Sequence, residues 1–408
     1  MKIRSFKGLT PAKGKAEAIA SLPYDVVNYQ QACEQAEGRP LSFMRVVRSE
    51  IELPEGTDPY SDAVYAHAKE NFERLIANGD LVREPENCMY LYRQEMGGHS
   101  QTGLVATFSA EDYDSDVIKK HEKTRAAKEN DRYRLTKTLR ANTGPVFLTV
   151  KDGTALDKII AEKDDADAIF DFVASDGIRH TGWKISDPEK LAKIKEIFDE
   201  IPYAYVADGH HRSASNARCA RDLKAENPNH TGDEDYNWFL SVVFPAGQLK
   251  ILPYNRVVRD LAGMDESEFL EKLSKVCTVT QSGEKSPPTP NFVDMYLGKK
   301  WYTLKFENTS SLGAVEGLDV SLLQDRVLSP ILKIGDPRTD ERIDFVGGIR
   351  GTGELEKLVD SGKFAVAFSM YPTTVAQLMD IADAGEIMPP KSTWFEPKLR
   401  SGLFVHTF

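Results

Sequence analysis

Cysteine is scarce in this 408-residue chain, which has four. Cys33, Cys88, Cys219 and Cys277 are far apart, and no two of them form a Cys-x-x-Cys pair. This spacing excludes a zinc knuckle and a disulfide framework as the basis of the fold. We therefore expect the protein to work in a reducing compartment.

Long apolar runs and an excess of positive charge are also missing. No run reaches the ~18 apolar residues of a membrane span, and no apolar signal segment follows the charged N-terminus. The 63 acidic residues outnumber the 52 lysines and arginines, so the net charge is -11. This balance argues against a broad nucleic-acid surface. We expect a cytoplasmic protein that binds neither membranes nor nucleic acid.

The remaining composition is that of a globular protein, with 41% hydrophobic and 28% charged residues. The length suggests two or three domains. Strand-like and helix-like segments follow one another without regular alternation, which predicts an α+β fold with mixed sheets. The composition changes after Arg259. We expect a first region over residues 1–260 and a C-terminal α/β region over 261–408.

Histidine is rare as well, yet two of the eight histidines are adjacent, in the stretch AYVADGHHRSASNAR at 204–218. The apolar run 203–207 predicts a buried strand, and a helix is expected from about 211 to 223. The start of a helix offers unpaired N–H groups and partial positive charge, which favour a phosphate. His210, His211 and Arg212 add donors, beside Asp208 and Ser213. The alternative is a plain turn in which Asp208 caps the helix.

A charged helical pattern covers residues 116–142 and includes the sequence HEKT at 121–124. Helical spacing places Lys128 and Arg132 roughly on one side, with Arg140 further along. These cations could line an anion site in which Glu122 is a base or a metal-binding carboxylate. The alternative is a solvated helix face with i, i+4 ion pairs.

Two further segments carry polar groups beside prolines. The run MPPKSTWFEPK at 388–398 presents Lys391 and Ser392 on a stiffened loop that suits a phosphate or a carboxylate. An extended surface segment packed by aromatic residues is the alternative. Asp25 follows Pro23 and is a candidate metal ligand, a partner for a substrate amine, or a turn residue.

Several motifs together resemble a known family. PYDVV, HEKT, RAN, DGHHRSAS and MPPKSTWFEPKLRSGL are similar to segments of a widespread bacterial family long described only as being of unknown function. The DGHHR sequence resembles the phosphate-binding turn of free-serine kinases with a ParB/sulfiredoxin-like fold. The resemblance implies a ParB/sulfiredoxin-like core, and we expect the C-terminal region to contribute the loop 388–398 to the site. It also implies transfer of phosphate from ADP, ATP or pyrophosphate to the hydroxyl of L-serine.

The resemblance also suggests roles for the residues named above. It places Asp208, His210, His211 and Arg212 on the phosphate-contacting turn. We add Ser213 to His210 and Arg212 as phosphate ligands, and Lys128, Arg132 and Arg140 for the rest of the donor. The expected catalytic residues are Glu122, Asp208 and His211, one carboxylate accepting the proton and the other binding Mg²⁺. The serine would be held by Asp25, Lys391 and Ser392.

Two other functions are weighed against the kinase. One is a nucleotide-binding ParB-like regulatory module without small-molecule turnover. The other is a zinc hydrolase built on His121, His210 and His211, which adjacent histidines on a helix disfavour because they point in different directions. The pattern leaves the phosphate donor open and is compatible with a homo-oligomer.

Overall fold

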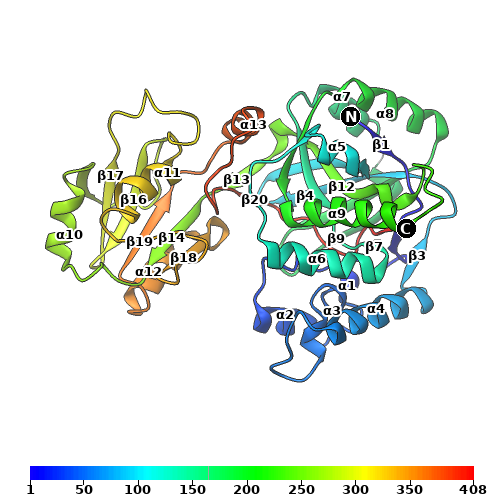
Figure 1. The fold of residues 1–408 in the computed structure, drawn as a ribbon, viewed down its shortest axis with the longest axis horizontal. Helices are drawn as coiled ribbons and strands as arrows, with labels where there is room; N and C mark the ends of the chain where they lie inside the picture. The colour runs from blue at the N-terminus through cyan, green and yellow to red at the C-terminus, as the bar shows by residue number, and fades with distance from the viewer. Residues whose placement is uncertain (164) are drawn as a thin grey trace. The chain divides into compact units, whose positions relative to one another are not determined.

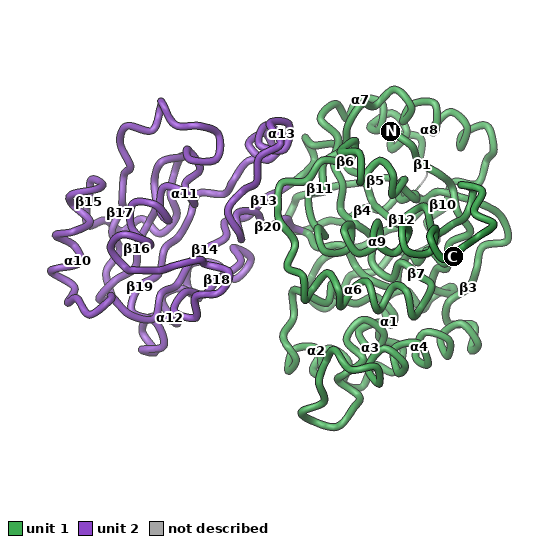
Figure 2. The backbone as a smooth tube through the Cα atoms, viewed as in Figure 1, with its two compact units in different colours: residues 1–249, 397–408 green, residues 250–396 purple. Residues whose placement is uncertain are grey.

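The computed structural model describes residues 1–163 and 165–408. The chain forms two compact units, which Figure 2 colours separately: unit 1 contains Met1–Leu249 and Pro397–Phe408, and unit 2 contains Lys250–Glu396. Both units combine helices with sheets, so the predicted α+β class with mixed sheets is confirmed. Within the described ranges, no helix has the length and apolar character needed to cross a membrane.

The units differ from the expected division at 260/261. The first boundary lies at 249/250, and Pro397–Phe408 returns to unit 1 instead of staying with the C-terminal region. The reason is the pairing of β13 (Lys250–Leu252) with β20 (Trp394–Glu396), which brings the two ends of unit 2 side by side. The functional roles expected of the two regions stay predictions.

A large mixed sheet forms the centre of unit 1 and joins nine strands among the described residues. Its order is β6-β11-β8-β12-β5-β4-β10-β9, with β1 paired to β5. β11 runs antiparallel to β8 and parallel to β6. In chain order the strands are β1 (Ile3–Arg4), β4 (Met89–Met96), β5 (His99–Ser109), β6 (Ile118–Lys119), β8 (Val146–Val150), β9 (Ala168–Val173), β10 (Arg179–Ile185), β11 (Ala204–Asp208) and β12 (Trp238–Pro245).

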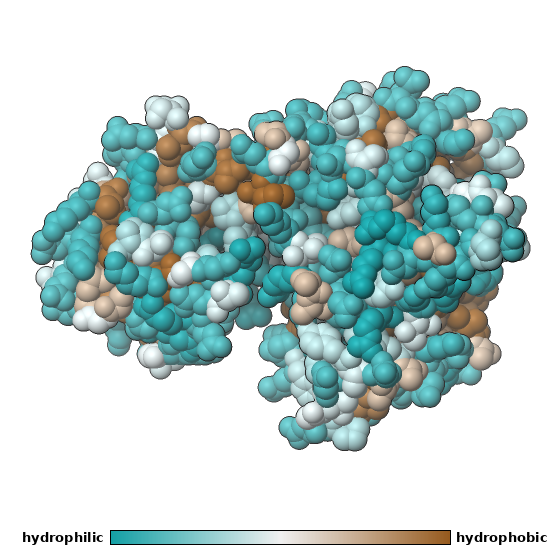
Figure 3. All heavy atoms as spheres, in the orientation of Figure 1, coloured by the Kyte–Doolittle hydropathy of each residue, from teal (hydrophilic) through white to brown (hydrophobic). Residues whose placement is uncertain are grey.

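Helices pack on this sheet and bury its apolar side chains. The main core includes residues of α7 (Thr154–Ala161), α8 (Pro188–Glu200) and α9 (His210–Glu226) together with the central strands. α6 (Ala126–Leu139) packs along α9, as Figure 1 shows. The surface over α6 and α9 is mainly hydrophilic on the face seen in Figure 3. The short α5 (Ala110–Asp114) follows β5.

A second core of unit 1 joins the N-terminal helices to α6. The helices are α1 (Ala16–Ile19), α2 (Tyr29–Ala36), α3 (Met44–Val47) and α4 (Asp62–Ala77), with the 3₁₀ turn η1 (Ser49–Glu52). Two small strand pairs connect the ends of the chain to this part: β2 (Leu9–Pro11) with β3 (Leu81–Arg83), and β7 (Ala141–Asn142) with β21 (His406–Thr407). Val405 lies fully buried in this core, so the C-terminal segment is an integral part of unit 1.

Unit 2 is built on a six-stranded antiparallel sheet, counted over its residues 250–396, all of which are described. Its order is β15-β17-β16-β19-β14-β18. The strands are β14 (Tyr254–Val258), β15 (Thr278–Ser282), β16 (Phe292–Leu297), β17 (Lys300–Lys305), β18 (Ile343–Gly347) and β19 (Val366–Met370). The helices are α10 (Glu266–Leu273), α11 (Asp319–Leu323), α12 (Gly351–Asp360) and α13 (Val375–Asp383).

The helix expected over 116–142 is wrong in extent. Only Ala126–Leu139 is helical, while residues 118–119 form β6 and the HEKT sequence lies in the connecting loop. β6 pairs with β11 through Ala204 and Tyr205. This pairing makes residues 118–119 part of the sheet, so Glu122 lies in a loop and not on a helix.

Candidate functional site

The strand, turn and helix predicted at 203–223 are present as β11, Gly209 and α9. Gly209 has φ 94°, a left-handed conformation that favours glycine. A Cβ atom at this position would lie 3.0 Å from the guanidinium nitrogens of Arg212. The glycine therefore allows both the sharp entry into α9 and the close approach of Arg212 to the turn.

Asp208 ends β11 and forms an ion pair with the C-terminal segment. Its Oδ2 accepts from Lys398 Nζ at 3.1 Å, and its Oδ1 accepts from Gly209 N at 2.8 Å. Burial alone raises the pKa of Asp208, but the positive charges of Lys398 and Arg212 outweigh it and hold that pKa well below its usual range. Asp208 is therefore a fixed negative charge at the start of the turn.

Arg212 lies in the first turn of α9, with its side chain buried. Its Nη1 donates to the carbonyl of Pro145. Its Nε is buried and makes no hydrogen bond to any described residue. A buried guanidinium with a spare donor at a helix N-terminus is suited to an anion.

His210 faces the HEKT loop. Its Nδ1 lies 3.9 Å from Glu122 Oε2, and its ring meets the His121 ring edge to face with centroids 4.4 Å apart. Burial lowers the pKa of His210 to about 4, the nearby charge of Asp208 opposing this shift. His210 is therefore neutral near pH 7. Glu122 is half-buried in the loop.

His211 points to the start of α6. Its Nε2 accepts a hydrogen bond of 3.1 Å from the backbone N–H of Arg125, the residue before the helix. Burial lowers the pKa of His211, and the carboxylates of Glu122 and Asp25 act in the opposite direction. Asp25 and Glu122 therefore lie near enough to His211 to influence its charge.

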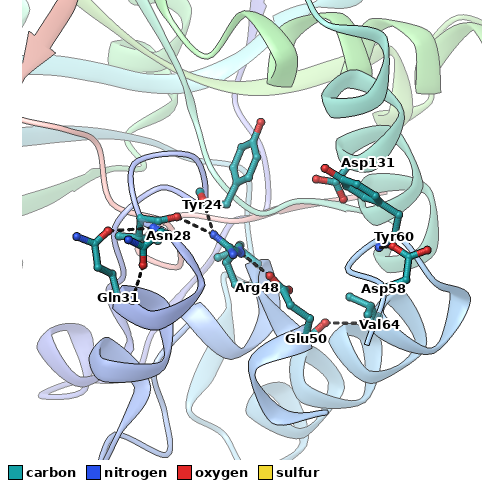
Figure 4. A network of polar contacts seen from close by, with 12 residues as sticks. Tyr24, Asn28, Gln31, Arg48, Glu50, Asp58, Tyr60, Val64 and Asp131 are labelled. Carbon is teal, nitrogen blue, oxygen red and sulfur yellow. Dashed lines mark hydrogen bonds and ion pairs between the residues drawn. The ribbon is translucent and has the colours of Figure 1, made fainter. Parts of the chain in front are cut away.

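The loop that carries Asp25 is fixed by Arg48, as Figure 4 shows. Arg48 donates to the carbonyls of Tyr24 and Val27 at 3.1 and 2.8 Å, and its Nε donates to Glu50 at 2.5 Å. Asp25 itself is exposed. The loop is therefore held by the hydrogen bonds from Arg48, and the carboxylate of Asp25 is exposed to solvent.

The other predicted phosphate ligands are placed differently. Ser213 is fully buried, and its hydroxyl donates to Gly209 O at 3.0 Å. Lys128 lies with its ammonium 5.5 Å from the centre of the Tyr60 ring. Arg140 ends α6 and stacks on Phe408 at 5.7 Å. A helix of this length spans about 21 Å, so Arg140 is far from the end of α6 that meets His211.

Arg132 is buried behind the turn. Its guanidinium pairs with Asp131 at 2.8 Å and lies 3.9 Å from the centre of the Tyr24 ring. Arg132, Tyr24 and Arg212 line a small pocket of about 20 Å³, together with Ser215 and other residues. That volume holds about one water molecule. Arg132 lines the same pocket as Arg212, and its own charge is paired with Asp131.

Lys391 and Ser392 belong to unit 2. The ammonium of Lys391 lies 5.4 Å from the centre of the Tyr254 ring, and the Ser392 hydroxyl donates to Pro389 O at 2.6 Å. Their predicted contact with a substrate carboxylate stays a prediction. Sequence reasoning chose Lys391 from the 388–398 run, whereas the lysine that pairs with Asp208 is Lys398 in unit 1. The run contains Pro-Lys twice, and this repetition was the signal that could have pointed to Lys398 as a second candidate.

The comparisons with known proteins give the following. No curated protein sequence matches the chain. Among solved structures, a free serine kinase variant in complex with AMP is similar over 71% of this chain and 87% of its own, with 14% identity and a TM-score of 0.37. A conserved hypothetical protein from Pyrococcus furiosus covers 73% and 93%, with 14% identity and a TM-score of 0.37. SbnI with a C-terminal truncation from Staphylococcus aureus covers 73% and 85%, with 12% identity and a TM-score of 0.38.

A family model matches residues 3–321, which contain the PYDVV, HEKT, RAN and DGHHR motifs. The resemblance to a family of unknown function, expected from these motifs, is confirmed. The chain belongs to the family described as "Protein of unknown function (DUF1015)".

Proposed function

We propose that the chain is a small-molecule kinase with a ParB/sulfiredoxin-like core. It transfers a phosphate from ADP, ATP or pyrophosphate to the hydroxyl of free L-serine and yields O-phosphoserine. The proposal rests on one observation: a glycine turn at the start of α9 gathers a buried arginine, two histidines and an ion-paired aspartate opposite Glu122.

The phosphate to be transferred binds at the N-terminus of α9. The first N–H groups of a helix have no intrahelical partner and carry partial positive charge. Arg212 adds the spare Nε donor, and His210 and His211 add imidazole groups next to it. Fixed donors of this kind stabilise the charge that develops on a transferring phosphoryl group.

Glu122 is the better placed of the two candidate bases. Both oxygens of Asp208 already accept hydrogen bonds, one from Lys398 and one from Gly209 N. Glu122 stands on a loop beside His210, with its side chain 34% exposed, so it is reachable by a substrate hydroxyl. We assign proton acceptance to Glu122 and pairing with the serine ammonium to Asp25.

The reaction balances in one step. The serine hydroxyl oxygen attacks the terminal phosphorus, and the bond from that phosphorus to the bridging oxygen of the donor breaks. The hydroxyl proton moves to Glu122. The donor leaves as AMP, ADP or phosphate, according to whether it entered as ADP, ATP or pyrophosphate.

Mg²⁺ is part of the proposal through the resemblance. The cation prefers oxygen ligands and keeps several waters. Asp208 fits this role, because each carboxylate oxygen has a second lone pair beyond the single bond described above. Mg²⁺ held by Asp208 and by the donor would neutralise phosphate charge.

The test uses the purified full chain with Mg²⁺, L-serine and each donor in turn, followed by phosphorus NMR. We expect O-phosphoserine with at least one donor. Arg212→Ala should lower turnover by ~10²–10³-fold, the usual loss when one preorganised charge contact is removed. Arg218→Ala is the matched control, because Arg218 lies on the same helix but stacks on Tyr133 at 4.0 Å.

Three results would decide between the proposal and its alternatives. O-phosphoserine that depends on Arg212 but not on Arg218 supports the kinase. Nucleotide binding without transfer to serine contradicts it and favours the regulatory module. Equal losses in both arginine variants would show that the turn is not the phosphate site.

A further inference from the structure

His121, Glu122 and His210 form a cluster that the kinase proposal leaves partly unexplained. Each residue contributes one ligand-type atom, and these atoms all lie within 4.8 Å of one another. His121 and Glu122 come from the loop after β6, while His210 opens α9. Two segments that are distant in sequence therefore bring two imidazoles and one carboxylate to one point.

Buried histidine nitrogens of this cluster are poorly satisfied. Within residues 1–163 and 165–408, Nε2 of His210 makes no hydrogen bond, and the His121 ring interacts with the backbone of Val206 without a hydrogen bond of normal geometry. The buried His180 differs: it bonds Tyr92 Oη at 2.7 Å and Arg400 Nε at 3.1 Å. A buried polar atom without a partner is unfavourable, and an ion or water commonly explains it.

We propose that His121, Glu122 and His210 bind one divalent transition-metal ion of the zinc class. Imidazole nitrogen is a preferred ligand of Zn²⁺, Co²⁺ and Ni²⁺, whereas Mg²⁺ takes oxygen ligands. Two nitrogens and one oxygen leave further coordination positions open to water or a substrate. The site is thus distinct from an oxygen-liganded Mg²⁺ at the donor phosphates.

The donor set of the cluster suits a cation. His121 and His210 are both buried and offer imidazole nitrogens, and Glu122 offers a carboxylate oxygen. Two imidazoles and one carboxylate are a known ligand set of zinc sites that keep an open position.

The ligand atoms lie within 4.8 Å of one another, so the cluster has to contract around an ion. Tetrahedral zinc with ligand bonds near 2.0–2.1 Å places its ligand atoms about 3.3 Å apart. His210 Nδ1 and Glu122 Oε2 are 3.9 Å apart. Glu122 stands on a loop and is half-buried, so its side chain can close this difference. A buried water is the competing occupant, and the experiment separates the two.

The experiment measures metal binding directly and does not depend on kinase activity. The full chain is stripped with a chelator, dialysed, and titrated with Co²⁺ alone while the visible absorption is recorded. We expect one equivalent of Co²⁺ per chain, a ligand-field spectrum, and displacement by Zn²⁺. Excess Mg²⁺ should leave the spectrum unchanged.

Variants then locate the ion. Glu122→Gln is the variant least disturbing to the fold, and it should weaken Co²⁺ binding by at least about 10–100-fold. His210→Gln should abolish the spectrum. His211→Gln is the matched control on the same helix, outside the cluster, and should keep one equivalent. Circular dichroism of each variant shows whether it is folded.

The outcomes are decisive in both directions. Stoichiometric binding that is lost with His210 and weakened with Glu122, but kept in His211→Gln, supports the site. Lack of Co²⁺ and Zn²⁺ binding by the folded wild-type chain overturns it and leaves water as the occupant. Binding that His211→Gln weakens as much as His210→Gln, or that Mg²⁺ displaces, also overturns the assignment.

Discussion

Replacing Lys398 with methionine tests whether the C-terminal segment holds the candidate site in place. The Lys398 side chain is 9% exposed, and its ammonium lies 3.1 Å from Asp208 Oδ2. Methionine keeps most of the side-chain stem and removes the charge. The backbone anchor stays, since the Lys398 carbonyl accepts from Gln94 Nε2 at 2.8 Å.

The expected loss follows from the burial of the pair. Removing one partner of a fully buried ion pair destabilises a protein by about 3–5 kcal/mol. The Asp208 side chain is 28% exposed and keeps its bond to Gly209 N, so solvent reduces this figure. We therefore expect a loss of about 1.5–3 kcal/mol, the range for a hydrogen bond to a charged group.

The assay is amide hydrogen exchange read by mass spectrometry, because it reports on each part of the chain separately. Peptides covering β11 and α9 should exchange roughly 10–150-fold faster in Lys398→Met, since every 1.4 kcal/mol is a factor of ten. Lys391→Met is the control: that lysine lies in unit 2, so exchange in unit 1 should not change. Unchanged exchange in Lys398→Met, or an equal effect of Lys391→Met, would refute the reasoning.

Three further substitutions probe the packing and the turn. Phe404→Ala should destabilise unit 1 by about 3–5 kcal/mol, because the ring is fully buried; the exposed Val173→Ala is the control in urea unfolding. Gly209→Ala should lower the stability by about 1–2 kcal/mol, because an alanine is strained in the left-handed conformation. The added methyl group should also displace Arg212, so an affinity for the phosphate donor equal to wild type would contradict this prediction. Burial lowers the pKa of His406 to about 3, below its unfolded value near 6.5, so its contribution is complete above pH 6.5 and falls by about 1.4 kcal/mol per unit toward pH 3. Urea unfolding between pH 7 and 4.5 should show this loss, and His406→Gln should make it smaller, the other buried histidines contributing the remainder.

Local patterns predicted the strand, the glycine turn and the start of α9 to within a few residues. Turn residues of the same kind lie in the hairpins around Gly97-Gly98 and Asp176-Gly177, where β4 pairs with β5 and β9 with β10. These elements depend on apolar runs and on turn residues that act over short distances. All the residues that determine such an element lie within the segment itself, so the sequence of that segment is enough to predict it.

The site depended on contacts that no local pattern contains. The charged run at 116–142 is helical by composition, but pairing of β6 with β11 converts its first part into a strand and a loop. Helical spacing grouped Lys128 with Arg132, yet packing against Tyr24 and Asp131 buries Arg132. Helical spacing predicts on which side of a helix a side chain lies. It does not predict which other element of the fold packs against that side.

The choice between Lys391 and Lys398 shows the same limit. Both follow a proline in the run 388–398, and composition treats them alike. The difference arises because β20 ends at Glu396, after which the chain re-enters unit 1. Lys398 then reaches Asp208 across a sequence separation of 190 residues. Lys398 pairs with Asp208 because residues 397–408 belong to unit 1, whereas Lys391 belongs to unit 2.

Glu122 connects the two proposals and constrains them jointly. As the base it must keep a lone pair for the serine proton, and as a metal ligand it gives one oxygen to the ion. The carboxylate has two oxygens, so both roles are compatible only if the ion binds through one of them. His121 has no part in the phosphate chemistry, and the position of its buried ring beside Glu122 and His210 has no explanation in the kinase alone. The metal site accounts for His121, the phosphate turn accounts for Arg212, and the edge-to-face contact of His210 with His121 places the two sites side by side.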